Sequence, residues 1–344
     1  MTKHFAVFVA SLTVLALIAG CPPAEPEPIS TPTVTPIAEP TKPEPAKAEP
    51  PQIQIPQAQA PEPQPPKPEN AKPQTPQTEK PQPKTVQPET TPAAPFHDKC
   101  ADILNKFVND NGMVDYKTLK QNKRELKKLL DEFDELDPNE YNSWSKEDKI
   151  AFWINVYNIQ LLKIIIENYP IQSSRILRLF WPPDSIRHIK GIWDKYKFIV
   201  MDEEFTLSEV EKRFFRGQFD EPRVFFAISH ASLSSPPLRN EPYYGGKLYE
   251  QMDEQVKKIL ASPYGFRIDR EDQTVYLSAI LQPSWFGAEF ISKYGTDKKF
   301  KDQQPPVRAV LNFIINYLPE QDVSFLEVQN YSVEYINYDW RLNE

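Results

Sequence analysis

Residues 145–170 read SKEDKIAFWINVYNIQLLKIIIENYP, and this stretch decides the fold. Between residues 150 and 166 only two asparagines, a glutamine and a lysine are polar. A helix that is apolar on all sides lies inside a domain rather than on its surface. Ser145 with an acidic residue three positions later is typical of a capped helix start, and Pro170 is a natural stop. The stretch therefore predicts a buried central helix over residues 149–168.

Two polar side chains inside this helix are candidates for a binding site. Asn155 and Asn158 are three residues apart, so they lie on one face of the helix. A buried amide without partners costs roughly 1–3 kcal/mol, so each of them needs hydrogen bonds. Either the amides brace the backbone of a neighbouring loop or they line a pocket, and the sequence leaves both interpretations open.

The rest of residues 96–344 mixes helical and strand patterns in what we expect to be a single domain. Helical spacing of apolar residues predicts helices over 97–137, 206–215, 246–261 and 307–317, and alternation predicts strands at 197–201, 332–341 and in a hairpin of 266–269 with 274–278. The apolar run RVFFAIS, residues 223–229, is typical of a buried strand. We predict an α+β fold with a helical N-terminal preface and the central buried helix packed on a small mixed sheet that includes 223–229.

The first twenty residues have the layout of a secretory signal peptide, with a basic start and an apolar run. They end in Ile18-Ala19-Gly20-Cys21, which resembles a bacterial lipobox. The alternatives are an ordinary signal peptide or a short N-terminal anchor helix, but the cysteine falls where cleavage is expected. We therefore expect Cys21 to be lipidated and to hold the protein at a membrane of the cell envelope. Pro22 rather than Asp follows the cysteine, which favours the periplasmic face of an outer membrane or the extracellular side.

Residues 21–95 are a proline-rich tract of a different composition. Of the 37 prolines of the chain, 24 fall between residues 22 and 95, where glycine and aromatic residues are absent. Such a segment buries too little apolar surface to offset the entropy of ordering. Proline at this density favours extended polyproline II, which at ~3.1 Å per residue reaches roughly 230 Å. We predict a disordered but semi-rigid spacer, although a binding tract for a partner is an alternative.

Charge and cysteine usage exclude several function classes for residues 96–344. The whole chain has a net charge of −8 and no basic patch in its sequence, which argues against nucleic acid as a partner. Cys100 is the single cysteine besides Cys21, so we expect no disulfide and no cysteine-based metal site. His188 and His230 have no acidic or imidazole neighbours at a ligand spacing, and there is no glycine-rich phosphate loop. We expect neither a metal nor a cofactor.

Residues 230–239, HASLSSPPLR, form the candidate site loop. Small polar residues at the end of the predicted strand, followed by a rigid Pro-Pro pair, are typical of a functional site, since function concentrates on loops held by rigid elements. We expect Ser234, together with Asn155 and Asn158, to line any cleft between this loop and the central helix. Arg239 would bind a carboxylate in that cleft, or else cap a helix or join a surface ion pair.

Six segments of the chain together have a recognisable pattern. They are GMVDY at 112–116, AFWINVYN at 151–158, the stretch 207–216, EPR at 221–223 with the residues up to 227, SSPPLR at 234–239 and YDW at 338–340. In this order, and over most of residues 97–343, the chain resembles domain-of-unknown-function family 547. The resemblance implies the fold but no particular activity.

The chain departs from the family's pattern where chemistry would be expected. The resemblance places Ser235 where the family typically has Cys, Lys212 and Phe225 where it often has His, and His230 where it more often has Cys. A nucleophile needs an adjacent base, and a serine hydroxyl needs one more than a thiol does. Two function classes remain. One is a non-catalytic binding or structural domain with a cell-wall or envelope-protein partner. The other is a hydrolase or acyltransferase that uses Ser235 with His230 on a cell-envelope or peptide substrate.

Overall fold

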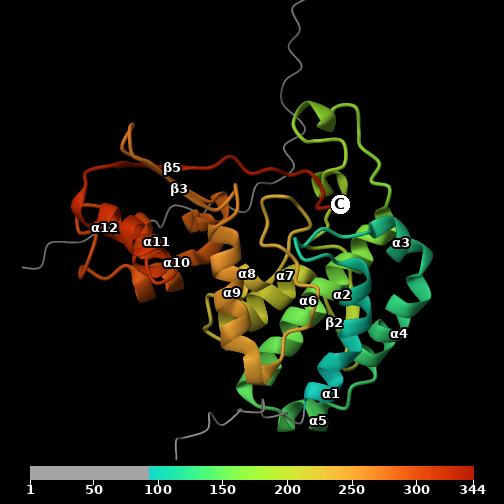
Figure 1. The fold of residues 1–344 in the computed structure, drawn as a ribbon. Coiled ribbons are helices and arrows are strands. Elements are labelled where there is room, and N and C mark those ends of the chain that lie inside the picture. The colour runs from blue at the N-terminus through green and yellow to red at the C-terminus, as the bar shows by residue number, and fades with distance from the viewer. Residues whose placement is uncertain (1–92) are drawn as a thin grey trace, which may run out of the picture. The chain divides into compact units, whose positions relative to one another are not determined.

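Helix α6, Lys146–Asn168, runs through the middle of residues 93–344, the part of the chain that the computed structural model describes (Figure 1). Every side chain from residue 150 to residue 162 is buried. The Ser145 hydroxyl accepts a hydrogen bond from the backbone N–H of Asp148 at 3.0 Å, which caps the helix as the sequence predicts. The prediction of a buried central helix is confirmed. The predicted leader, Cys21 and the spacer as far as residue 92 lie outside the described residues.

Length and composition alone would also allow α6 to cross a membrane, and it is the one helix of the described residues that passes this test. However, 89% of its most apolar 18-residue window is buried inside the domain. Such burial is typical of a core helix, because a membrane span presents its apolar side chains to lipid.

The helical N-terminal preface predicted from the sequence is confirmed. It begins at Ala94, two residues before the expected domain boundary, and Ala93 is already buried. A left-handed turn at Gly112, with a φ of 78°, brings the chain close to Pro237, where an added Cβ would clash. The preface consists of α1 Ala94–His97, η1 Asp98–Cys100, α2 Ala101–Phe107, α3 Tyr116–Gln121, α4 Lys123–Asp134 and α5 Pro138–Ser143.

A hairpin and a π-helix follow α6 after a long connection that holds η2, Leu177–Leu179, and η3, Ile186–His188. Strands β1, Phe198–Val200, and β2, Glu203–Phe205, pair antiparallel. Thr206 and Glu209 form the predicted capping box at the start of α7, Leu207–Val210. The chain then widens into the π-helix η4, Glu211–Gln218.

The predicted strand over 223–229 is wrong, because residues Val224–Ala227 form the short helix α8. Its turn is closed by hydrogen bonds such as that from the Phe226 N–H to the Arg223 carbonyl, at 2.9 Å. A short apolar run does not distinguish a buried strand from a buried helical turn by periodicity. In this helical turn the side chain of Val224 lies in the larger of two hydrophobic clusters, and that of Phe226 lies in the smaller one.

The C-terminal part carries the mixed sheet of the predicted α+β fold. Strands β3, Phe266–Asp269, and β4, Thr274–Leu277, form the expected antiparallel hairpin, and β5, Ser332–Tyr335, pairs parallel to β4. The expected strand at 332–341 is therefore shorter than predicted. The helices of this part are η5 Gly245–Lys247, α9 Leu248–Leu260, η6 Ala279–Leu281, α10 Pro283–Tyr294, α11 Pro305–Ile314 and α12 Glu320–Val328.

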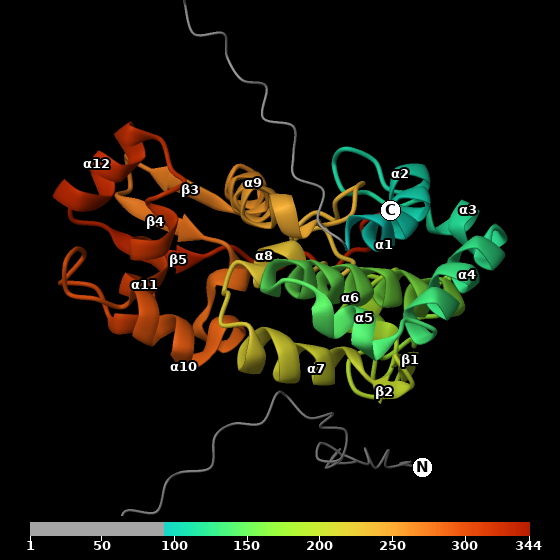
Figure 2. The same ribbon diagram turned by 90° about the horizontal axis from the view of Figure 1, so that it is seen from below.

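Two hydrophobic clusters divide the described residues. The larger one contains α6, the preface, the β1–β2 hairpin and the first half of α9, and the smaller one contains the mixed sheet, the second half of α9 and α10 to α12. Figure 2 shows β3 to β5 beside α11 and α12, at the end of the domain away from α3 and α4. The α+β class is confirmed, but α6 packs on helices and on the β1–β2 hairpin, for example through Trp153 and Phe205 with ring centroids 5.1 Å apart. The mixed sheet belongs to the other cluster.

Candidate functional site

The candidate site loop, residues 230–239, follows α8 and precedes the chain that leads into α9, and we call it the serine loop. Asn158 of α6 holds the backbone just before this loop with two hydrogen bonds. The Asn158 amide nitrogen donates to the Ala227 carbonyl at 3.0 Å, and the amide oxygen accepts from the Ser229 N–H at 2.9 Å. Since Asn158 and Ser229 are almost completely buried, these bonds are shielded from water.

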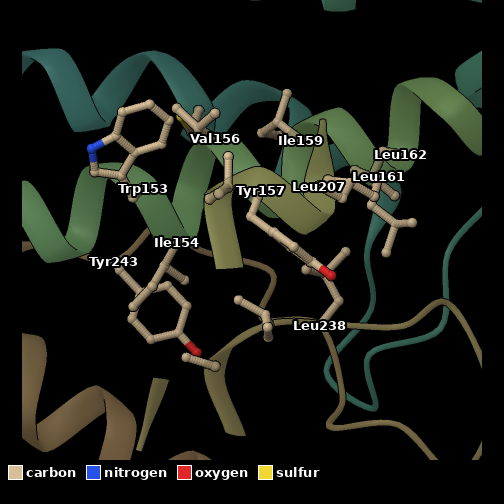
Figure 3. Close-up of a cluster of buried hydrophobic side chains, with 14 of the residues drawn as sticks. Trp153, Ile154, Val156, Tyr157, Ile159, Leu161, Leu162, Leu207, Leu238 and Tyr243 are labelled. Carbon is tan, nitrogen blue, oxygen red and sulfur yellow. The ribbon is translucent and has the colours of Figure 1, made fainter. Parts of the chain in front are cut away.

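Asn155 holds the segment that follows the loop in the same way. Its amide donates to the Tyr243 carbonyl at 2.9 Å and accepts from the Tyr243 N–H at 2.9 Å. Figure 3 shows Tyr243 and Leu238 facing the apolar side chains of α6. Both asparagines therefore brace loop backbone, which is the first of the two interpretations that the sequence leaves open. These bonds join the loop region directly to α6 where we expected a cleft.

Ser235 is buried and its hydroxyl is engaged by the loop itself. The Oγ lies 2.8 Å from the Ser232 carbonyl oxygen and 3.2 Å from that of Pro236, and it donates toward them. The Ser229 hydroxyl is 3.4 Å away. No imidazole of the described residues makes a hydrogen bond to Ser235. A base must lie within hydrogen-bond reach of the proton it removes, and Ser235 lacks that arrangement here.

His230, the imidazole next to Ser235 in the sequence, packs between two indoles. Its ring centroid lies 5.5 Å from that of Trp193 and 5.0 Å from that of Trp285, and its Nδ1 has no hydrogen-bond partner. Burial lowers the pKa of His230 from its ordinary value of 6.5 to about 4, because charging the ring there would require desolvation of the cation. The imidazole is therefore neutral near pH 7 and acts as an aromatic packing element.

The remaining predicted site residues also serve structure. Arg239 makes ion pairs with Glu241 and, at 2.9 Å, with Glu254, so carboxylates of this chain occupy its guanidinium. This is the ion-pair alternative considered from the sequence. Lys212 is exposed, and Phe225 packs edge-on against a phenylalanine of α10. Neither of these two positions brings a base to the loop.

The C-terminal segment covers the loop, a feature that the sequence does not signal. The backbone N–H of Asp339 donates to the Ser234 hydroxyl at 2.7 Å, and the Leu233 N–H donates to the Arg341 carbonyl at 2.9 Å. Ser234 thus holds the closing segment in place. Its distance in sequence, more than a hundred residues from the loop, explains why local patterns gave no hint of the contact.

The sequence also gives no sign of a buried pair of polar side chains at the start of α6. His97 Nε2 lies 3.6 Å from Asp148 Oδ1, and both side chains are about 1% exposed. Asp148 also accepts hydrogen bonds from the Ser145 hydroxyl at 2.7 Å and from the Gly245 N–H at 3.2 Å. This network ties the preface and η5 to α6. The sequence pattern indicates Asp148 only as part of a helix cap, whereas its carboxylate also contacts His97 and Gly245.

Four surface cavities of about 550 to 720 Å³ lie on other parts of the domain. The residues that line them include neither Ser234 nor Ser235 nor His230. Within the described residues, no three His, Cys, Asp or Glu side chains gather as a metal site would require. Cys100 is a free buried thiol whose pKa is raised by burial, so it is not activated as a nucleophile.

These features define a helix-rich α+β domain whose serine loop is fixed to a buried central helix by two asparagines. Residues 141–260, from α5 to the end of α9, match the model of a family described as "Protein of unknown function, DUF547". The match supports the resemblance seen in the sequence, and it includes α6, η4, α8 and the whole loop. No curated protein and no solved structure matches the chain.

Proposed function

We propose that the chain is an envelope lipoprotein whose domain, residues 96–344, binds a partner or serves a structural role without catalysis. The apolar leader that ends at Cys21 supports attachment through a lipid on that cysteine, and the proline-rich residues 21–95 support a spacer that holds the domain away from the membrane. The proposed location is the periplasmic face of an outer membrane, or the outside of the cell.

The observation that carries the non-catalytic assignment is the hydrogen bonding of Ser235. Its hydroxyl points at backbone carbonyls of its own loop, and the nearby imidazole of His230 is neutral and wedged between two tryptophans. Activation of a serine requires a base that takes its proton and a group that orients the base. Neither role is filled around Ser235.

A cell-wall component or an envelope protein is the partner class that fits this placement. The acidic net charge of the chain argues against nucleic acid, because the phosphate backbone requires clustered cations. The proposed domain would present its outer surface to such a partner, while the serine loop keeps the core closed beneath the C-terminal segment.

Labelling with a serine-reactive fluorophosphonate tests the assignment directly. We expect no labelling of the wild type, and we expect Ser235→Ala and His230→Ala to behave like it. Labelling of the wild type that disappears in both variants would overturn the proposal in favour of a serine hydrolase. Circular dichroism of each variant controls for folding.

Fractionation of cells tests the anchoring separately. We expect the mature wild-type protein to sediment with membranes and to carry a diacylglyceryl group on Cys21. Cys21→Ser should release the protein or leave its leader uncleaved. A Cys21→Ser protein that is fully processed and still bound to membranes would contradict lipid attachment at this residue.

A further inference from the structure

Exposed apolar side chains gather in one short segment after α6, residues 173–181, which we call the tip. Six large hydrophobic residues of the described part are exposed, and three of them lie within five positions here: Ile176 at 60%, Leu179 at 80% and Phe180 at 69%. Figure 1 shows this yellow-green segment extending away from the helices of the domain. A cluster of exposed apolar side chains marks an interaction site more reliably than single ones do.

The tip is a folded turn and not a loose strand of chain. The Arg178 N–H donates to the Ser174 carbonyl at 3.1 Å, and the Phe180 and Trp181 N–H groups donate to the Leu177 carbonyl at 3.0 and 2.9 Å. These bonds close η2, Leu177–Leu179, and turn the side chains of the tip outward.

The base of the tip is fixed by aromatic packing. The Arg187 guanidinium lies over the rings of Trp181 and Trp340, at 4.6 and 5.0 Å from their centroids. Trp340 belongs to the C-terminal segment that covers the serine loop, so this segment also holds the base of the tip. The exposed side chains of Ile176, Leu179 and Phe180 therefore project from a base that is packed against the domain.

The charge of the tip is opposite to that of the whole protein. Arg175 and Arg178 are exposed, and neither pairs with a carboxylate of the described residues. Residues 171–183 contain no aspartate or glutamate, whereas the chain as a whole has a net charge of −8. Unpaired arginines beside exposed leucine and phenylalanine complement a surface that is anionic outside and apolar just beneath.

We propose that the tip inserts into the surface of a lipid bilayer that contains anionic lipids. The two arginines would contact headgroup phosphates, while Leu179 and Phe180 enter the acyl boundary. Leucine, phenylalanine and tryptophan favour this interface, and each cation near an anionic surface strengthens binding. The proposal rests on the proposed function only in placing the chain beside a membrane. The lipid on Cys21 would tether the chain, and the tip would set how the domain lies on the bilayer.

Vesicle binding by an unlipidated chain tests this proposal. The chain from residue 22 to residue 344 lacks the leader and Cys21, and it retains every described residue of both hydrophobic clusters. We expect it to float with phosphatidylcholine vesicles that contain phosphatidylglycerol, and to bind pure phosphatidylcholine far more weakly. Leu179→Glu with Phe180→Glu, and separately Arg175→Glu with Arg178→Glu, should each lower partitioning by at least roughly tenfold.

Val328→Glu is the matched control, because Val328 is also a large exposed hydrophobic residue, at 75%, and lies at the end of α12. It should bind vesicles like the wild type. A wild-type chain that binds no vesicles, or tip variants that bind as well as the wild type, would overturn the proposal. Since this chain carries no lipid, the outcome is independent of whether Cys21 is modified, and thermal unfolding of each variant controls for folding.

Discussion

Removal of the Asn158 amide should loosen the serine loop and destabilise the domain. The amide makes two hydrogen bonds to backbone that is almost fully buried: the Ala227 carbonyl and the Ser229 N–H. Leaving a buried donor or acceptor without a partner costs roughly 1–3 kcal/mol. Two such groups are left unpaired, so we expect Asn158→Ala to lower the free energy of unfolding by about 2–6 kcal/mol.

A second variant separates lost hydrogen bonds from lost volume. Leucine has the same number and branching of side-chain heavy atoms as asparagine, so it leaves no cavity, but it can neither donate nor accept. If the hydrogen bonds matter, Asn158→Leu should still lower the free energy of unfolding by at least about 2 kcal/mol. Lys163→Ala, at a half-exposed position of the same helix, is the control and should change stability by less than about 0.5 kcal/mol.

Urea unfolding followed by tryptophan fluorescence measures these differences, and hydrogen exchange locates them. The Ser229 amide should exchange faster in both Asn158 variants, while amides in the middle of α6 change only with global stability. An Asn158→Leu variant as stable as the wild type, with an unchanged Ser229 exchange rate, would refute the assignment of Asn158 as a backbone brace.

Three further predictions test the core, the imidazole and the boundary. Phe152→Ala should lower the free energy of unfolding by about 3–5 kcal/mol in urea titrations, since Phe152 is completely buried. His230 has a folded pKa of about 4 against 6.5 when unfolded, so below pH 6.5 the unfolded chain binds a proton that the native ring resists. Stability should fall by up to roughly 3 kcal/mol as pH drops from 6.5 to 4. His230→Phe should remove this contribution of His230 to the pH dependence of stability. A variant whose stability varies with pH as the wild type's does would refute the burial of a neutral imidazole at position 230. Limited proteolysis should leave a fragment that starts near residue 93, and a protected core that begins before residue 80 would contradict the spacer.

Apolar periodicity, helix capping and strand alternation predicted the elements whose own residues determine their structure. The all-round apolar pattern of residues 150–166 identified α6, and Thr206 with Glu209 identified the start of α7. The alternating segments on either side of a turn identified the β3–β4 hairpin. In each case the residues that form the element also contain the information that specifies it.

Tertiary contacts decided the elements that the sequence did not predict. The run at 223–229 has strand-like residues, but Arg223 pairs with Asp253 of α9, and Phe226 packs against rings of α10 and α11 where the chain closes into α8. The cover over the serine loop depends on hydrogen bonds between residues near 234 and near 339. No local pattern encodes such a pairing, because neither segment forms it alone.

The support of the serine loop lies mainly in its backbone and in the backbone on either side of it. Asn158 and Asn155 hold the backbone just before and just after the loop, and the closing segment bonds to the backbone of Leu233. The side chains of Ser232 and Ser234 also bond to the closing segment. Backbone hydrogen bonds do not depend on whether position 235 carries a thiol or a hydroxyl. An exchange between cysteine and serine at position 235 would therefore leave these bonds in place. Under the proposed binding role, the exposed surface makes the contacts, and the tip is where exposed apolar and cationic side chains coincide.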